Sequence, residues 1–211
     1  MKLSLRCLAV MCLFVGSVYA QGTSTENRII TKTFRTSGGL DPVTTFQYLD
    51  GLGRPTQTVV QEGGSQQTGK PDLLTSTQTY DAFGRVEKHY LPTPLSAGGG
   101  SYQPASTVQT QAQTFYSDAS PFSKSEYEAS PLNRVLKQFG AGNAWHSNNR
   151  AVGSQYQSNS GGDVFIWTVS GHTLSKGSYY AQGSLYKTVV TTESNAQVIE
   201  FKDKEGQLIE K

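Results

Sequence analysis

A short turn pattern recurs along this chain, and it restricts the fold more than any other feature does. The clearest copy reads YDAFGR at residues 80–85, between a Thr-rich run and a second run of strand-forming residues. Asp81 can accept hydrogen bonds from the amides that follow it, and Gly84 can adopt the positive φ that a three-residue hairpin loop requires. The pattern therefore predicts a β-hairpin around residues 81–84.

Three looser copies share one order of residue types: an aromatic, an acidic or polar residue, a Gly or Asn, and then a polar and an apolar residue. They read YLDGLGRP at 48–55, YEASPLNRV at 127–135 and FKDKEGQLI at 201–209. Asn133 replaces Gly, and Asn is the next most tolerant residue at positive φ. A recurring turn-and-strand unit indicates an architecture rather than an active site. The residues predicted to build these structural turns are Tyr48, Asp50, Gly53, Arg54, Tyr80, Asp81, Gly84, Arg85, Tyr127, Asn133, Arg134, Phe201, Asp203 and Gly206.

These copies resemble the YD repeat of bacterial RHS proteins, in which short Tyr-Asp-x-x-Gly-Arg hairpins stack into a spiralling β-sheet shell. The clearest copy matches that motif at every fixed position. Segments 48–59, 90–92, 131–136 and 183–187 are similar to the region ahead of the repeat array in secreted members, and the likeness covers roughly residues 30–211. The resemblance implies a hollow shell in the full-length protein, often around a C-terminal polymorphic toxin that is released by self-cleavage further downstream.

Some features depart from a regular repeat. The four aromatic residues are unevenly spaced, Glu128 replaces the expected Asp, and Pro131 imposes a different local path. A regular solenoid would keep a fixed period. We therefore expect an all-β fold in which irregular antiparallel hairpins lead into a YD-repeat β-shell. One domain is expected over residues 28–211, truncated at its C-terminal end, because a domain rarely ends on an exposed strand edge.

The N-terminus has the features of a secretory signal peptide. Lys2 and Arg6 precede a short apolar run, and small or tolerated residues lead up to Ala20. The apolar run is too short to cross a bilayer, so we expect cleavage after Ala20 and no membrane span. The signal peptide would occupy residues 1–20, followed by a mobile segment at 21–27. Export would place the mature protein in the periplasm, at the cell surface or outside the cell.

Loss of the signal peptide changes the composition. Cys7 and Cys12 both lie in it, so the mature chain would contain no disulfide. Without Lys2 and Arg6 the basic residues fall from 18 to 16, which equals the 16 acidic residues. A neutral chain without a clustered basic face does not suit nucleic-acid binding. Its stability must come from sheet packing, to which Tyr and Thr bring much of the β propensity.

Frequent Gly and Pro residues favour short strands over long helices. Loops are expected at 38–42 and 62–70, a flexible connection at 93–105 and a long polar loop at 147–162. Strands are expected at 28–35, 44–48, 55–61, 75–80, 85–90, 112–116, 134–139, 164–170, 185–192, 196–202 and 207–211, with a connection at 117–125.

Histidines and acids do not form a recognisable catalytic or metal site in the sequence. His89, His146 and His172 lack metal-site spacing and have no cysteine in the mature chain to assist them. Asp50 and Asp81 could form a carboxylate pair of the kind that hydrolyses glycosides, yet each is accounted for as a turn residue.

Other binding motifs are also missing from the sequence. The three glycines at 98–100 lack the Lys and the helix of a phosphate loop. Residues 203–206 lack the spacing of oxygen donors that a calcium loop needs, and no Gly-x-Ser-x-Gly elbow is present. We therefore expect a protein that is not an enzyme and uses no cofactor or metal.

Two groups of residues leave a choice between a structural and a binding role. Arg54, Arg85 and Arg134 each follow a turn, where an Arg can lie over a neighbouring Tyr or pair with an acid on the next hairpin. Their repetition favours the structural role, since a ligand rarely needs the same residue in every repeat. Trp145, beside a polar loop, could pack at the mouth of a sheet or stack on a sugar.

Two functions follow from these features. The first is a non-catalytic structural region of an exported RHS/YD-repeat protein, with downstream repeats and a toxin of the same polypeptide as partners. The alternative is a secreted carbohydrate- or surface-binding β module that contacts a cell-surface glycan or protein. Aromatic residues aligned between successive hairpins would favour the first function, and an exposed aromatic cluster on one face would favour the second.

Overall fold

The computed structural model describes residues 26–35, 37–39, 42–64, 70–95 and 98–211. The expected signal peptide therefore lies outside the described residues, as does most of the expected mobile segment at 21–27. The described part is mostly β, with one large antiparallel sheet, a separate two-stranded hairpin and two short helices. The antiparallel β architecture agrees with the sequence prediction, and the helices depart from an all-β fold.

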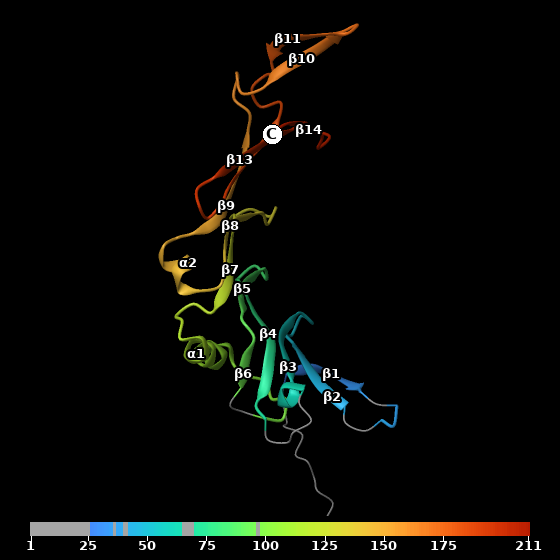
Figure 1. Ribbon diagram of the computed structural model, residues 1–211, viewed down its shortest axis with the longest axis vertical. Coiled ribbons are helices and arrows are strands. Elements are labelled where there is room, and N and C mark those ends of the chain that lie inside the picture. The colour runs from blue at the N-terminus through green and yellow to red at the C-terminus, as the bar shows by residue number, and fades with distance from the viewer. Residues whose placement is uncertain (1–25, 36, 40–41, 65–69, 96–97) are drawn as a thin grey trace, which may run out of the picture.

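The large sheet is a meander in which most strands pair with their neighbours in sequence. Its 12 strands are β1 (Asn27–Phe34), β2 (Pro42–Leu49), β3 (Pro55–Val60), β4 (Asp72–Tyr80), β5 (Val86–Tyr90), β6 (Thr93–Leu95), β7 (Phe122–Tyr127), β8 (Val135–Phe139), β9 (Ala151–Ser158), β12 (Tyr186–Thr191), β13 (Gln197–Lys202) and β14 (Leu208–Glu210). They pair in the order β1-β2-β3-β4-β5-β7-β8-β9-β12-β13-β14, and β6 pairs with the start of β4. Figure 1 shows them following one another along the long axis. Within the described residues this sheet is open, with β1 and β14 at its edges.

The four predicted turns join β2 to β3, β4 to β5, β7 to β8 and β13 to β14. In each pair the strand register shifts where the turn begins. The last loop residue has a positive φ in every case, at Gly53, Gly84, Asn133 and Gly206. A register shift next to a residue in the left-handed region is the geometry of a hairpin loop closed by a bulge.

Residues 105–116 form helix α1 (Ala105–Tyr116), so the strand predicted at 112–116 is wrong. Val108 and Ala112, four residues apart, lie on one helix face and are fully buried. The other positions are mostly Thr and Gln, so the apolar stripe consists of two small residues and gives only a weak helical signal. In Figure 1 the helix lies beside β6 and β4.

Two connections predicted from the sequence are also wrong. Strand β9 occupies much of the expected polar loop at 147–162, and β7 begins inside the expected connection at 117–125. Strand β9 is polar but is paired on both edges, with β8 and β12. Its backbone hydrogen bonds, rather than apolar burial, hold it in the sheet, and hydropathy patterns do not report that.

The larger core lies between α1 and the N-terminal half of the sheet. Tyr48, Val59 and Leu74 are completely buried there, together with the two apolar residues of the helix. The full cluster consists of Phe46, Tyr48, Val59, Leu74, Tyr90, Leu95, Val108, Ala112 and Phe122. This part of the molecule is therefore two layers deep, with the helix covering one sheet face.

The connection after β6 is fastened to this core, whereas the sequence predicted it to be flexible. Buried Asp72 accepts hydrogen bonds from the amides of Glu62 (2.8 Å) and Gly100 (2.6 Å). The Gln57 side chain both donates to and accepts from the backbone of Gln103, at 3.0 Å in each direction. Side chains distant in sequence thus hold residues 100–103, which explains why local composition misled the prediction.

A second, smaller core lies near the C-terminal strands. Val164, Leu185 and Phe201 are buried together, with Tyr180 and Ile209 packed against them. Strands β10 (Phe165–Ser170) and β11 (Thr173–Tyr179) leave this core as a separate hairpin, which projects at the top of Figure 1.

Candidate functional site

The turn at residues 50–54 shows how one copy of the pattern is built. The Asp50 amide donates to the Arg54 carbonyl oxygen (2.9 Å), and the Gly53 amide donates to the Asp50 carbonyl oxygen (3.0 Å). The carboxylate Oδ1 of Asp50 accepts from the amides of Leu52 and Arg54, each at 2.9 Å. Oδ2 accepts from Nε of Arg54 at 2.7 Å. Both carboxylate oxygens are thus engaged inside their own turn.

The turn at residues 81–85 has the same set of bonds. Asp81 Oδ1 accepts from the amides of Phe83 (2.9 Å) and Arg85 (3.0 Å), and Oδ2 accepts from Arg85 Nε (2.7 Å). The Gly84 amide donates to the Asp81 carbonyl oxygen at 2.9 Å. The five residues 81–85 therefore form a loop that is closed by the hydrogen bonds between its acid and its arginine.

The other two predicted turns vary the scheme. Glu128 binds Arg134 through both carboxylate oxygens, which accept from Nε at 3.0 and 2.9 Å, and the loop between them is longer. Asp203 Oδ1 accepts from the amide of Gln207 (2.8 Å), so a Gln occupies the position that Arg holds elsewhere. The last turn consequently keeps the backbone geometry but lacks the arginine.

Each turn arginine also reaches the next hairpin. The guanidinium carbon of Arg54 lies 4.1 Å from the ring centroid of Tyr80, and Arg54 Nη1 donates to the Gly84 carbonyl oxygen (3.0 Å). Arg85 lies over Tyr127 (4.6 Å) and donates to the Glu128 carbonyl oxygen (3.0 Å). The carboxylate partner is in the same turn, whereas the aromatic partner is in the following one.

Arg134 continues this series with a residue that sequence reading missed. Its guanidinium carbon lies 4.4 Å from the ring centroid of Tyr156 in β9. Tyr156 stands three residues before the buried Asn159, whose Oδ1 accepts from the Leu185 amide (2.8 Å) and whose carbonyl oxygen accepts from the Gly183 amide (3.0 Å). These bonds reproduce the other turns, but the β10–β11 hairpin is inserted within the loop, and the insertion hides the pattern in the sequence.

Each of these tyrosines returns a hydrogen bond to the preceding hairpin. The tyrosine hydroxyl donates to a backbone carbonyl oxygen of that hairpin. This carbonyl belongs to the residue directly after the arginine that contacts the tyrosine ring. The bonds run from Tyr80 to Pro55 (2.7 Å), from Tyr127 to Val86 (2.9 Å) and from Tyr156 to Val135 (3.2 Å). We call each such arginine, tyrosine and carbonyl set an Arg–Tyr joint.

The first and last predicted aromatic residues do not form such joints. Tyr48 is fully buried in the larger core, where its hydroxyl donates to the Gly100 carbonyl oxygen and its ring meets Tyr102 edge-on. Phe201 belongs to the smaller core and has Lys187 Nζ at 5.4 Å from its ring centroid.

Three turn acids, Asp50, Asp81 and Glu128, are held in their charged form. Hydrogen bonds from the Arg134 side chain, and then from Ser130, lower the pKa of Glu128 to about 2. The amide of Arg54 lowers the pKa of Asp50. Burial opposes the charge on Asp81, but the amide and side chain of Arg85 outweigh it, so its pKa also lies below the usual value.

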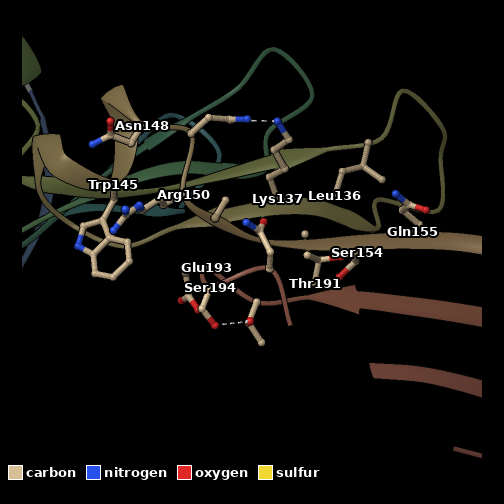
Figure 2. A pocket seen from close by; sticks show the side chains of 15 residues that line it. Leu136, Lys137, Trp145, Asn148, Arg150, Ser154, Gln155, Thr191, Glu193 and Ser194 are labelled. Carbon is tan, nitrogen blue, oxygen red and sulfur yellow. Dashed lines mark hydrogen bonds between the residues drawn. The ribbon is translucent and has the colours of Figure 1, made fainter. Parts of the chain in front are cut away.

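A separate open hollow of about 860 Å³ lies on the sheet beside α2 (Asn143–Ser147). Figure 2 shows Trp145 and Arg150 at one side of it and Glu193 and Ser194 below, on the turn between β12 and β13. The next residue, His146, fastens the helix to the sheet, stacked on Phe139 with ring centroids 5.2 Å apart. Trp145 itself remains 38% exposed.

Neither of the remaining histidines belongs to a metal cluster. His89 Nε2 lies 3.2 Å from the Ser76 hydroxyl, and His172 stands in the turn of the projecting hairpin. Across the described ranges, no group of three or more His, Cys, Asp or Glu side chains is placed to hold a metal ion. No helix in the same ranges is long and apolar enough to cross a membrane.

Comparison with known proteins places the chain in a family. Residues 22–158 match the domain of unknown function DUF6443, which is more than half of the sequence. The chain belongs to the DUF6443 family. The DUF6443 region takes in β1 to β9 and the first three turns, up to the end of the strand that carries Tyr156. No curated protein and no solved structure matches the chain.

Proposed function

We propose that this chain is a non-catalytic structural region of an exported RHS/YD-repeat protein, whose hairpins form part of the wall of a β-shell around a C-terminal toxin. The observation that carries the proposal is the series of three Arg–Tyr joints. Each joint links one hairpin to the next with the same chemistry, at Arg54–Tyr80, Arg85–Tyr127 and Arg134–Tyr156. A contact that recurs between successive hairpins suits a wall that is assembled from a series of hairpins.

The state of the acids supports a structural role over hydrolysis. A general acid needs a pKa near the working pH so that it holds a proton to donate. The pKa values of Asp50, Asp81 and Glu128 are all lowered, and every one of these carboxylates is bound by the arginine of its own turn. Such groups resemble structural ion pairs more closely than a catalytic pair.

In this proposal the partners are further hairpins of the same polypeptide. An antiparallel meander grows by adding one hairpin beside the last, and each added turn can place its tyrosine over the previous arginine. The shell would enclose the toxin, and the polypeptide would be exported before the shell assembles.

The test is the size and shape of the native particle. Antibodies raised against this chain would be used to isolate the polypeptide that carries it from the producing cells and their medium, for electron cryomicroscopy. We expect a hollow particle several times larger than this chain, with the described sheet as one part of its wall. Cells that lack the gene provide the control. Recovery of the chain only as a small, separate protein with no enclosed volume would overturn the proposal.

A further inference from the structure

The hollow beside α2 is built around a fixed aromatic ring. A β-carbon placed on Gly140 would stand 3.5 Å from Trp145 Nε1 and 3.6 Å from Cδ1, so the indole lies directly against this glycine. The Trp145 amide donates to the Gly142 carbonyl oxygen (3.1 Å), and its carbonyl oxygen accepts from the Arg150 amide (2.9 Å). The ring is thus supported from behind by backbone while part of it stays open to the hollow.

Most of the other side chains that line the hollow are polar, and some of them are already hydrogen-bonded within the fold. Asn148 Nδ2 donates to the Ala144 carbonyl oxygen (2.9 Å) and Gln155 Oε1 accepts from Gln157 Nε2 (3.1 Å), whereas the side chains of Ser154 and Asn195 form no hydrogen bond within the described residues. Three charged residues, Lys137, Arg150 and Glu193, also line the hollow, and none of them forms an ion pair with any residue in the described part of the chain. Lys137 Nζ donates to Asn149 Oδ1 (3.1 Å). Amide, hydroxyl and charged groups here are therefore available to a ligand.

The exposed indole ring and the polar lining together indicate which class of ligand the hollow can bind. Pockets for apolar small molecules carry only a few polar groups, whereas most of the residues that line this hollow are polar or charged. A nucleic-acid groove would need clustered cations, whereas Lys137 and Arg150 stand opposite Glu193 here. A sugar has an apolar C–H face that packs on an aromatic ring and hydroxyl groups that bond to amides and hydroxyls around it.

We propose that this hollow binds an oligosaccharide, with one sugar ring stacked on Trp145 and its hydroxyl groups bound by the surrounding polar side chains. Arg150 and Glu193 would set the preference among sugars, since they present opposite charges at two sides of the hollow. The site is independent of the Arg–Tyr joints, so it does not depend on assembly into a shell.

The chain offers a matched control for the test. It contains two tryptophans, and Trp167 in the projecting hairpin is 55% exposed, away from the hollow. The protein would be applied to an array of neutral and uronic-acid oligosaccharides, and the oligosaccharide that binds would be titrated into Trp167→Phe, whose fluorescence then reports Trp145 alone. We expect a saturable change in that fluorescence.

Substitutions then locate the site. Trp145→Ala should weaken binding about tenfold or more, the loss expected when one stacking contact is removed, while Trp167→Ala should bind as the wild type does. Asn195→Ala, in an exposed turn, gives a second test that does not depend on the packing of α2, and it too should weaken binding. Thermal unfolding would verify that each variant is folded.

Three results would overturn the proposal. One is a folded wild-type protein that binds nothing on the array. Another is binding that survives both Trp145→Ala and Asn195→Ala. The third is a protein that ignores the array but binds peptides through these residues, which would make the hollow a polypeptide site.

Discussion

At the scale of single residues, the acids of the first three turns have both carboxylate oxygens hydrogen-bonded within their own loop. Asp81 was predicted as a turn residue from its type and position, because the bonds it makes are local. The partnership of Arg134 with Tyr156 could not be predicted in the same way, since it joins strands across a sheet and depends on register. The local hydrogen bonds of the turn could be predicted from the sequence, whereas the cross-strand tyrosine partner of the arginine could not.

Two turn glycines permit a matched comparison of stability. Gly53 (φ 78°) has open space around an added β-carbon, whereas at Gly84 (φ 81°) that carbon would stand 2.4 Å from Nη1 of Arg54. Gly53→Ala should cost only the left-handed strain of an L-residue, about 1–2 kcal/mol. Gly84→Ala should cost about 1 kcal/mol more, because the flexible Arg54 head must leave its hydrogen bond to the Gly84 carbonyl oxygen. Urea unfolding measures the loss in free energy of unfolding for each variant. Equal losses would show that the Arg54 side chain does not restrict position 84.

The pH dependence of stability follows from Glu128. Its pKa is lowered to about 2 in the folded protein, from 4.5 when free, so its stabilising effect is complete above the unfolded pKa and fades as the pH falls toward 2. Glu128→Gln should therefore lower the urea midpoint at pH 7, and more than about half of that difference should vanish by pH 3. Glu205→Gln, in the exposed last turn, serves as the control. A midpoint difference that stays constant from pH 7 to pH 3 would contradict the assignment.

At the scale of elements, strands could be predicted where residues of one type alternate or cluster along a segment. The prediction was wrong where contacts with other elements determine the secondary structure. Helix α1 has a weak apolar stripe, and its place is set by the packing of Val108 and Ala112 in the core that it shares with β4 and β6. Strand β9 is polar and exists because two other strands pair with it. Neither cause is local, so neither was visible in a window of sequence.

The connection at residues 100–103 should depend on Asp72. In Asp72→Asn one acceptor oxygen becomes an NH₂ group facing a backbone amide donor, which leaves both groups unsatisfied at a cost of about 1–3 kcal/mol. Chymotrypsin should then cut after Tyr102 faster than in the wild type, because the connection is released. Asp203→Asn keeps an acceptor in an exposed turn and should leave that cleavage unchanged. Slow cleavage in both variants would show that other contacts hold the connection.

The projecting hairpin should be separable from the rest of the fold. Among the strands of the described residues, β10 and β11 pair only with each other, while Val164 and Tyr180 at their base belong to the smaller core. Replacing residues 165–179 by Asn-Gly should close a tight turn there and leave the far-ultraviolet spectrum of the remaining sheet and its unfolding temperature nearly unchanged. Collapse of the C-terminal strands in this variant would instead assign the hairpin a part in the core.

At the scale of the whole molecule, a long open meander is held by two small cores with thin sheet between them. The Arg–Tyr joints lie along this sheet and link successive hairpins. The YD-repeat assignment and the closed shell both belong to the proposal, because the family shown is DUF6443 and the described sheet is open. The central claim is that these arginines and tyrosines fasten hairpins together.

Double-mutant cycles at the three joints test that claim most directly. Arginine→Gln and tyrosine→Leu would be made singly and together at Arg54–Tyr80, Arg85–Tyr127 and Arg134–Tyr156, and the free energies of unfolding measured. We predict a favourable coupling of about 0.5–1 kcal/mol at each joint and none for the mismatched pair Arg85–Tyr156. Coupling no larger within the joints than in the mismatched pair would contradict the account.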